Sequence, residues 1–178
     1  MKSASKAAWI SPVKARTREE AMATTSTDLY RSVMGNDFKS IKVGIYPGDG
    51  VLDPRWESTQ YFSKKLNKWM TSEADVDVAG GKDGPEVLPG GGTSLHDVSG
   101  WFPSKEFWIP EGTEYSAELI EIRRDPKLKT SQYNPKLKGY HYQLEPRTRM
   151  TVLAFKGALD NMARAAVARQ CELAKAKG

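Results

Sequence analysis

Two stretches of this chain hold side chains that can do chemistry. The first, Gly90-Gly91-Gly92-Thr93-Ser94-Leu95-His96-Asp97, joins three glycines to two hydroxyl side chains. Glycines leave backbone amides unshielded and permit positive φ, so the chain can approach a polar ligand closely and the hydroxyls can hydrogen-bond it. The same residues suit a turn whose hydroxyls cap the next helix, and turn preferences alone do not separate the two interpretations.

The second stretch runs from Gly139 to Glu145. If it forms a strand, His141, Gln143 and Glu145 project from one face, because alternate side chains share a face. They would place a proton-exchanging ring, an amide and a carboxylate in a row. A single histidine is more often structural, but three polar groups on one face near a glycine-rich cleft favour a site.

Arg31 is the third candidate. Leu29, Arg31 and Val33 alternate with Tyr30 and Ser32, a pattern that predicts a strand with the arginine on the apolar face. An arginine there needs an anion, either a structural carboxylate or a ligand phosphate, because leaving its charge unpaired is costly.

A hydrolase using Ser94, His96 and Asp97 is a weaker interpretation. A catalytic triad needs residues brought together from separate elements, whereas these three crowd on one turn.

The elements between these candidates follow from composition and spacing. Asp53-Pro54 predicts a helix start, and apolar residues then recur at helical spacing that is typical of core packing: Phe62, Leu66, Trp69 and Met70. Residues 71–92 are interrupted by glycine and proline, which predicts a long loop of the kind that is often functional.

After the glycines, Ser94 to Val98 suits a short helix whose N-terminus would face a phosphate or ribose. Residues 105–109 and 118–123 are expected to be strands, with a turn between them at residues 110–113. An amphipathic pattern from Thr151 to Lys175 predicts a long helix that covers the core.

Composition restricts the class of protein. With 178 residues, 39% of them hydrophobic, we expect one compact domain, preceded by a flexible arm over residues 1–26. The single cysteine, Cys171, excludes an intramolecular disulfide framework and fits a reducing compartment. No apolar run approaches the roughly 18 residues of a membrane span, and the first residues lack a secretory signal, so we expect no membrane partner.

The net charge of +5 suits an acidic partner without selecting one. An aromatic segment, Tyr133-Asn134-Pro135, lies among the basic residues Lys127, Lys129, Lys136 and Lys138. Such interleaving allows an alternative function, a non-enzymatic binding module for nucleic acid or an acidic protein. The affinity of such a binding module would fall steeply with salt.

An ordered set of short motifs resembles a family of toxins exported by type VI secretion and grouped with NAD-dependent ADP-ribosyltransferases. The set spans about residues 27 to 174 and comprises Leu29-Tyr30-Arg31, Gly91-Gly92-Thr93-Ser94, Trp108-Ile109-Pro110-Glu111-Gly112-Thr113, Tyr133-Asn134, His141-Tyr142, Leu159-Asp160-Asn161 and Arg169-Gln170. The resemblance implies an α+β fold over residues 27–178: two small, mainly antiparallel sheets around an NAD cleft, with flanking helices and a long C-terminal helix.

The resemblance also implies roles. Arg31 would contact a phosphate or ribose of NAD, and Thr93 and Ser94 would hold the nicotinamide ribose, with Gly92 and Tyr142 as further NAD contacts. Gln143-Leu144-Glu145 has the Gln-x-Glu form of the glutamate motif in the wider group, but His141 matches this toxin family better. We therefore rank His141 before Glu145 as the residue that assists the chemistry.

The implied activity is cleavage of NAD at the nicotinamide–ribose bond, with ADP-ribose passed to a macromolecule or to water. NAD would be a substrate, and no metal is expected. Such a toxin would act in the cytoplasm of the producing or a target cell after export by a non-Sec route. Its partner would be an acidic immunity protein that complements the basic surface.

Overall fold

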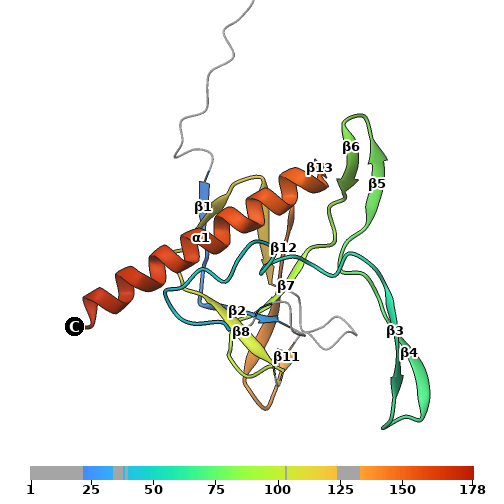
Figure 1. The fold of residues 1–178 in the computed structure, drawn as a ribbon, viewed down its shortest axis with the longest axis horizontal. Coiled ribbons are helices and arrows are strands. Elements are labelled where there is room, and N and C mark those ends of the chain that lie inside the picture. Colours follow the sequence, from blue (N-terminus) through green and yellow to red (C-terminus); the bar gives the residue numbers. More distant parts are fainter. Residues whose placement is uncertain (1–21, 34–37, 39, 103, 124–132) are drawn as a thin grey trace, which may run out of the picture.

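The computed structural model describes residues 22–33, 38, 40–102, 104–123 and 133–178. Small antiparallel sheets and one long C-terminal helix make up the described part, which confirms the expected α+β class (Figure 1). No helix in the described part is long and apolar enough to cross a membrane.

The largest sheet carries the candidate site residues. Its strands run in the order β10-β12-β7-β2-β8, and β11 pairs with β12 beside this path. The bounds are β2 (Leu29–Val33), β7 (Thr93–His96), β8 (Lys105–Ile109), β10 (Leu119–Arg123), β11 (Tyr133–Asn134) and β12 (Gly139–Pro146). The strands predicted around Arg31, at 105–109, at 118–123 and around His141 are therefore confirmed.

Three smaller sheets complete the strand content of the described residues. One pairs β1 (Met22–Thr24) with β9 (Glu114–Ser116), and another joins β13 (Met150–Thr151), β6 (Gly84–Val87) and β5 (Val78–Gly81). The third is a hairpin of β3 (Thr59–Ser63) and β4 (Lys68–Ser72). Figure 1 shows this hairpin projecting away from the main sheet and the helix.

The helix α1 (Val152–Ala176) begins where predicted, because the Thr151 side chain accepts a hydrogen bond from the Ala154 amide at 3.2 Å. Such a cap satisfies an amide that has no partner within the helix. The buried face of α1, which includes Phe155 and Leu159, belongs to the same hydrophobic cluster as Leu29 and Leu144 of the main sheet.

The strand register divides the main sheet into two faces. Tyr30 pairs with His96 and His96 pairs with His141, while Ser94 pairs with Gln143. Directly paired residues lie on the same face, so these five side chains share one face, which we call the polar face. The opposite face carries residues of the hydrophobic core, among them Leu29, Leu95 and Leu144.

Two predicted helices and one predicted loop are wrong. Residues 59–70, expected within a helix, belong to the β3–β4 hairpin, and Ser94 belongs to β7 and not to a helix N-terminus. The predicted loop at residues 71–92 contains β5 and β6. In each case pairing with another strand outweighs local propensity, which is a weak determinant of structure.

Parts of two expected segments lie outside the described residues. The expected arm, residues 1–26, is described only at its end, where Met22–Thr24 form β1. Of the basic segment, Lys127 and Lys129 are not described, whereas Lys136 and Lys138 lie exposed between β11 and β12.

Candidate functional site

The closest contact between the predicted catalytic residues joins Ser94 of β7 to His141 of β12. Ser94 Oγ lies 3.1 Å from His141 Nε2, within hydrogen-bonding distance. The antiparallel register pairs Ser94 with Gln143 and His141 with His96, so the contact runs diagonally across two strands. Two residues that are 47 positions apart are thereby brought into a single hydroxyl–imidazole pair.

His96 lies beside this pair and is almost fully buried, with 3% of its surface exposed. Its ring centroid is 5.4 Å from that of His141, and its other ring neighbours are Trp101, stacked at 4.3 Å, and Phe102, edge-on at 5.6 Å. Burial, with smaller contributions from the charges of His141 and Arg31, lowers the pKa of His96 to about 3, against a backbone hydrogen bond with Tyr30. His96 is therefore neutral at physiological pH.

Gln143 and Glu145 continue the polar face along β12. Both are largely buried, with exposed fractions of 8% and 6%. Gln143 Nε2 donates to the Gly90 carbonyl at 3.5 Å, and Glu145 pairs with Ile120 of β10. The glutamate is four residues from His141, or about 13 Å along an extended strand, so the two side chains serve different parts of the face.

The glycine-rich segment is held closely against its neighbours. A Cβ atom on Gly92 would lie 2.0 Å from the Leu144 carbonyl oxygen and 2.8 Å from Glu145 Cα. The hydroxyl of the adjacent Thr93 is fully buried and donates to the Leu52 carbonyl at 2.6 Å. Gly92 thus allows β7 to approach β12, and Thr93 fastens β7 to the segment before residue 53.

Arg31 lies on the opposite face of β2 from Tyr30 and does not point toward His141. Its guanidinium donates to two backbone carbonyls, that of Ser94 at 2.9 Å and that of Asp53 at 2.6 Å. Burial lowers the pKa of Arg31, while the charges of Asp75 and Asp53 oppose this shift. The direct partners of Arg31 are thus carbonyl oxygens, with the carboxylates of Asp75 and Asp53 acting through their charge, and the arginine holds the backbone of the residue whose hydroxyl contacts His141.

Tyr142 is also turned away from the polar face. It pairs with Leu95 and lies in the hydrophobic cluster with 9% of its surface exposed. Burial raises the pKa of its hydroxyl. The structure therefore brings together Ser94 and His141, places Gln143 and Glu145 on the same face, and sets Arg31, Thr93 and Tyr142 behind them.

Asp97 does not form a triad with Ser94 and His96. Its carboxylate accepts from the Tyr140 amide at 2.6 Å and closes the end of the β7–β12 pair. The sequence pattern indicated His96 only as part of this hydrolase triad and did not indicate its place beside His141. Alternation along a strand beginning at Thr93 would have put Ser94 and His96 on one face.

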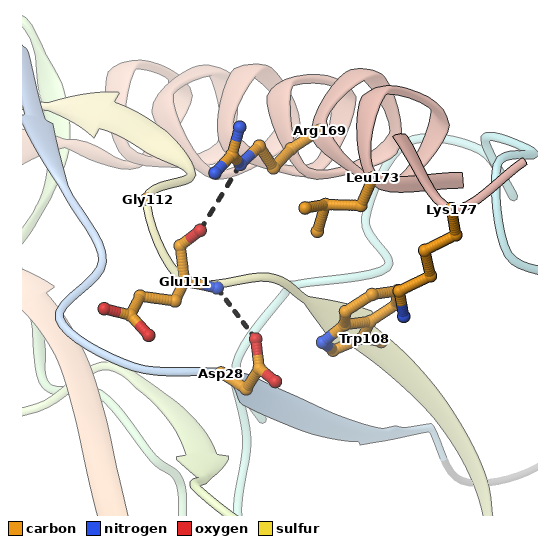
Figure 2. A pocket seen from close by; sticks show the side chains of 7 residues that line it. All are labelled: Asp28, Trp108, Glu111, Gly112, Arg169, Leu173 and Lys177. Carbon is orange, nitrogen blue, oxygen red and sulfur yellow. Dashed lines mark hydrogen bonds between the residues drawn. The ribbon is translucent and has the colours of Figure 1, made fainter. Parts of the chain in front are cut away.

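A pocket of about 400 Å³ lies at the β8 edge of the main sheet. Figure 2 shows it between the C-terminal part of α1 and the turn after β8. Its lining residues are Asp28, Trp108, Glu111, Gly112, Arg169, Leu173 and Lys177. Asp28 accepts from the Glu111 amide at 2.9 Å, and Arg169 donates to the Glu111 carbonyl at 3.4 Å, so these charged groups also fix the turn. Neither Ser94 nor His141 lines this pocket.

Within the described part of the chain, no group of histidine, cysteine or carboxylate side chains is arranged to hold a metal ion. The described polar face offers the hydroxyls of Ser94 and Tyr30, two imidazoles, an amide and a carboxylate. These groups can orient a sugar hydroxyl, relay a proton and stabilise a developing positive charge.

Comparison with known proteins defines the class. The sequence pattern of the Tse2 ADP-ribosyltransferase toxin family matches residues 17–171, and the chain belongs to this family. A particular relative is Toxin Tse2 of Pseudomonas aeruginosa strain PAO1, which is 35% identical over 101 residues. The alignment covers 56% of this chain and 60% of the toxin, so the chain spans less than two thirds of that relative's length.

Proposed function

We propose that this protein is an NAD-dependent toxin that breaks the nicotinamide–ribose bond and transfers ADP-ribose to a macromolecule or to water. Membership of the Tse2 ADP-ribosyltransferase toxin family supports this reaction. The observation that carries the proposal is the 3.1 Å contact between Ser94 Oγ and His141 Nε2 on the polar face. The non-enzymatic binding module has no comparable support from the described residues.

The reaction needs groups that tolerate and stabilise positive charge. As nicotinamide leaves, the ribose takes on oxocarbenium character, so a cation next to it would oppose the reaction. His96 stays neutral because it is buried, so it adds no positive charge beside His141. In this proposal Ser94 orients a ribose hydroxyl, and His141 holds the Ser94 hydroxyl or relays a proton from the ribose.

Glu145 supplies negative charge in the proposed mechanism. Its carboxylate lies on the same face as His141 and is 6% exposed, so its field is screened less than that of a surface carboxylate. Because it is separated from His141 along β12, Glu145 would stabilise charge from a distance while His141 and Ser94 touch the ribose. In this proposal His141 therefore remains the first candidate, before Glu145, for the residue that assists the chemistry.

The remaining predicted residues act through the strands in this proposal. Arg31 positions Ser94 through its backbone carbonyl, and Thr93 fixes the start of β7. Gly92 sets the spacing between β7 and β12, and Tyr142 packs behind the site. Direct contact of these four residues with NAD, which the family resemblance implies, stays a prediction.

We further propose that the toxin acts in the cytoplasm of the producing or a target cell after export by a non-Sec route. An acidic immunity protein would neutralise it, since the net charge of +5 favours association with an acidic surface.

The test is NAD consumption by the purified protein, together with incorporation of labelled ADP-ribose in cell extract. Ser94→Ala and His141→Ala should each slow NAD loss by about 100-fold or more, as expected when a positioned group that acts in the transition state is removed. Glu145→Gln should slow it less. Thr71→Ala, a change at an exposed hydroxyl of the β3–β4 hairpin, is the matched control and should keep full activity.

Circular dichroism and melting temperature would establish that each variant is folded. A folded parent protein that neither consumes NAD nor labels any extract would overturn the proposed function and favour the binding module.

A further inference from the structure

The β3–β4 hairpin exposes several large apolar side chains to solvent. Tyr61, Phe62, Leu66 and Trp69 have exposed fractions of 51%, 45%, 55% and 68%. Single exposed apolar residues are ordinary, but a contiguous group marks an interaction surface. These four residues fall within one 14-residue hairpin, in which the rings of Phe62 and Trp69 are in contact, Tyr61 lies on the other face and Leu66 lies in the connecting turn.

Both faces of the hairpin are apolar. The register pairs Phe62 with Trp69 on one face and Tyr61 with Met70 on the other. The rings of Phe62 and Trp69 meet edge to face with centroids 5.7 Å apart, so they stabilise each other but leave much of their surface in water. A flat protein surface would cover one face only, whereas a medium into which the hairpin inserts would cover both.

Positive charge gathers at the tip of the hairpin. Lys64, Lys65 and Lys68 lie around Leu66, and residues 59–72 contain no acidic side chain. Aromatic side chains that sit at the level of lipid headgroups, with lysines reaching the phosphates, are typical of segments that lie in a membrane interface. The positive charge and the apolar surface of the hairpin thus both fit a membrane interface.

Polar contacts join the two chain segments that flank the hairpin to each other. Ser58 Oγ donates to the Glu73 carboxylate at 2.9 Å and accepts from the Ala74 amide at 3.0 Å. Arg55 donates to the Glu73 carbonyl at 2.7 Å. The hairpin is therefore closed at its base and projects its tip away from the main sheet (Figure 1).

We propose that the β3–β4 hairpin docks the protein onto an anionic phospholipid surface, with Leu66 and the aromatic rings in the interface and the lysines on the phosphates. This revises the expectation of no membrane partner, which considered only spanning and secretory segments. The proposal does not depend on the proposed NAD chemistry. Nucleic acid fits less well, because the edge-to-face pair of Phe62 and Trp69 offers no parallel stacking platform.

The experiment is sedimentation of the full chain with vesicles, in the absence of NAD. Vesicles of phosphatidylcholine containing about one third phosphatidylglycerol should bind the protein, and vesicles of phosphatidylcholine alone should bind it at least ~10-fold more weakly. Binding to the anionic vesicles should weaken as salt is raised.

Two double variants separate the contributions. Phe62→Ser with Trp69→Ser, and Lys64→Glu with Lys65→Glu, should each reduce binding to anionic vesicles by at least ~10-fold. The matched controls remove an exposed apolar side chain and exposed lysines elsewhere: Leu153→Ser on α1, and Lys82→Glu with Lys136→Glu. Both controls should bind almost as well as the parent.

A spectroscopic measurement reports insertion directly. Tryptophan emission of the parent should shift to shorter wavelength on anionic vesicles, and Trp69→Phe should keep the binding but lose most of the shift. Three results would overturn the proposal: no sedimentation with anionic vesicles, equal losses in the controls, or binding of a single-stranded oligonucleotide that the Phe62 and Trp69 variant abolishes while vesicle binding is absent.

Discussion

His96 is the residue whose charge state is most strongly set by its surroundings. Its pKa of about 3 lies below the ordinary value of 6.5, so between these values the unfolded chain binds a proton that the folded protein does not. The free energy of unfolding should therefore decrease as pH falls through this window, by up to about 1.4 kcal/mol per pH unit.

The measurement is urea unfolding between about pH 7 and about pH 5, compared with His96→Gln. The variant lacks the titrating ring, so its stability should depend less steeply on pH in this range. If the parent and the variant show parallel pH dependences, the buried neutral state of His96 is wrong.

Two roles of Arg31 can be distinguished by experiment: positioning of Ser94 and direct contact with NAD. Because its planar fork bridges the carbonyls of Ser94 and Asp53, Arg31→Lys should lose one of the two bonds and destabilise the protein by about 1–3 kcal/mol. A positioning role also predicts a lower kcat with little change in KM for NAD. If the arginine instead contacted an NAD phosphate, KM would rise while the free energy of unfolding stayed the same.

At the scale of elements, the close approach of β7 to β12 brings Ser94 and His141 together. Gly92→Ala would place a methyl group 2.0 Å from the Leu144 carbonyl oxygen, which forces the strands apart and should cost more than about 2 kcal/mol of stability. Gly80→Ala in β5 is the matched control, since its Cβ would meet nothing within 4 Å, and it should change stability by less than about 0.5 kcal/mol. Thermal melting of both variants compares them. Equal melting temperatures would contradict the close approach of the strands.

The sequence allowed prediction of those elements whose pattern is local. Alternation identified the strands containing Arg31 and His141, and helical periodicity identified α1. The sequence predicted a helix in place of the β3–β4 hairpin. Phe62, Leu66, Trp69 and Met70 have helical spacing by chance, and Asp53-Pro54 has the form of a helix start.

For the candidate site, the sequence allowed prediction of the residues but not of their spatial arrangement. Ser94 and His141 were both identified, but their contact depends on the register between β7 and β12, which a single sequence does not reveal. The opposite orientations of Arg31 and Tyr142 follow from the same register. Strand alternation alone could have placed His96 beside Ser94 on the polar face.

At the scale of the whole molecule, the pocket borders the polar face, because Trp108 lines the pocket and pairs with Tyr30, whereas the β3–β4 hairpin is separate from both (Figure 1). The polar face is backed by the hydrophobic core and α1, the pocket lies at the β8 edge, and the β3–β4 hairpin projects away from the main sheet (Figure 1). A chain of the Tse2 ADP-ribosyltransferase toxin family could therefore carry out chemistry on one part of its surface and contact another structure with the hairpin.

The most direct test of the central claim is a double-mutant cycle on NAD cleavage with Ser94→Ala and His141→Ala. Because the two side chains act as one hydrogen-bonded pair, the double variant should lose little more activity than the worse single variant. If the two losses multiply, or if folded parent protein leaves NAD intact, the Ser94–His141 pair is not the catalytic unit.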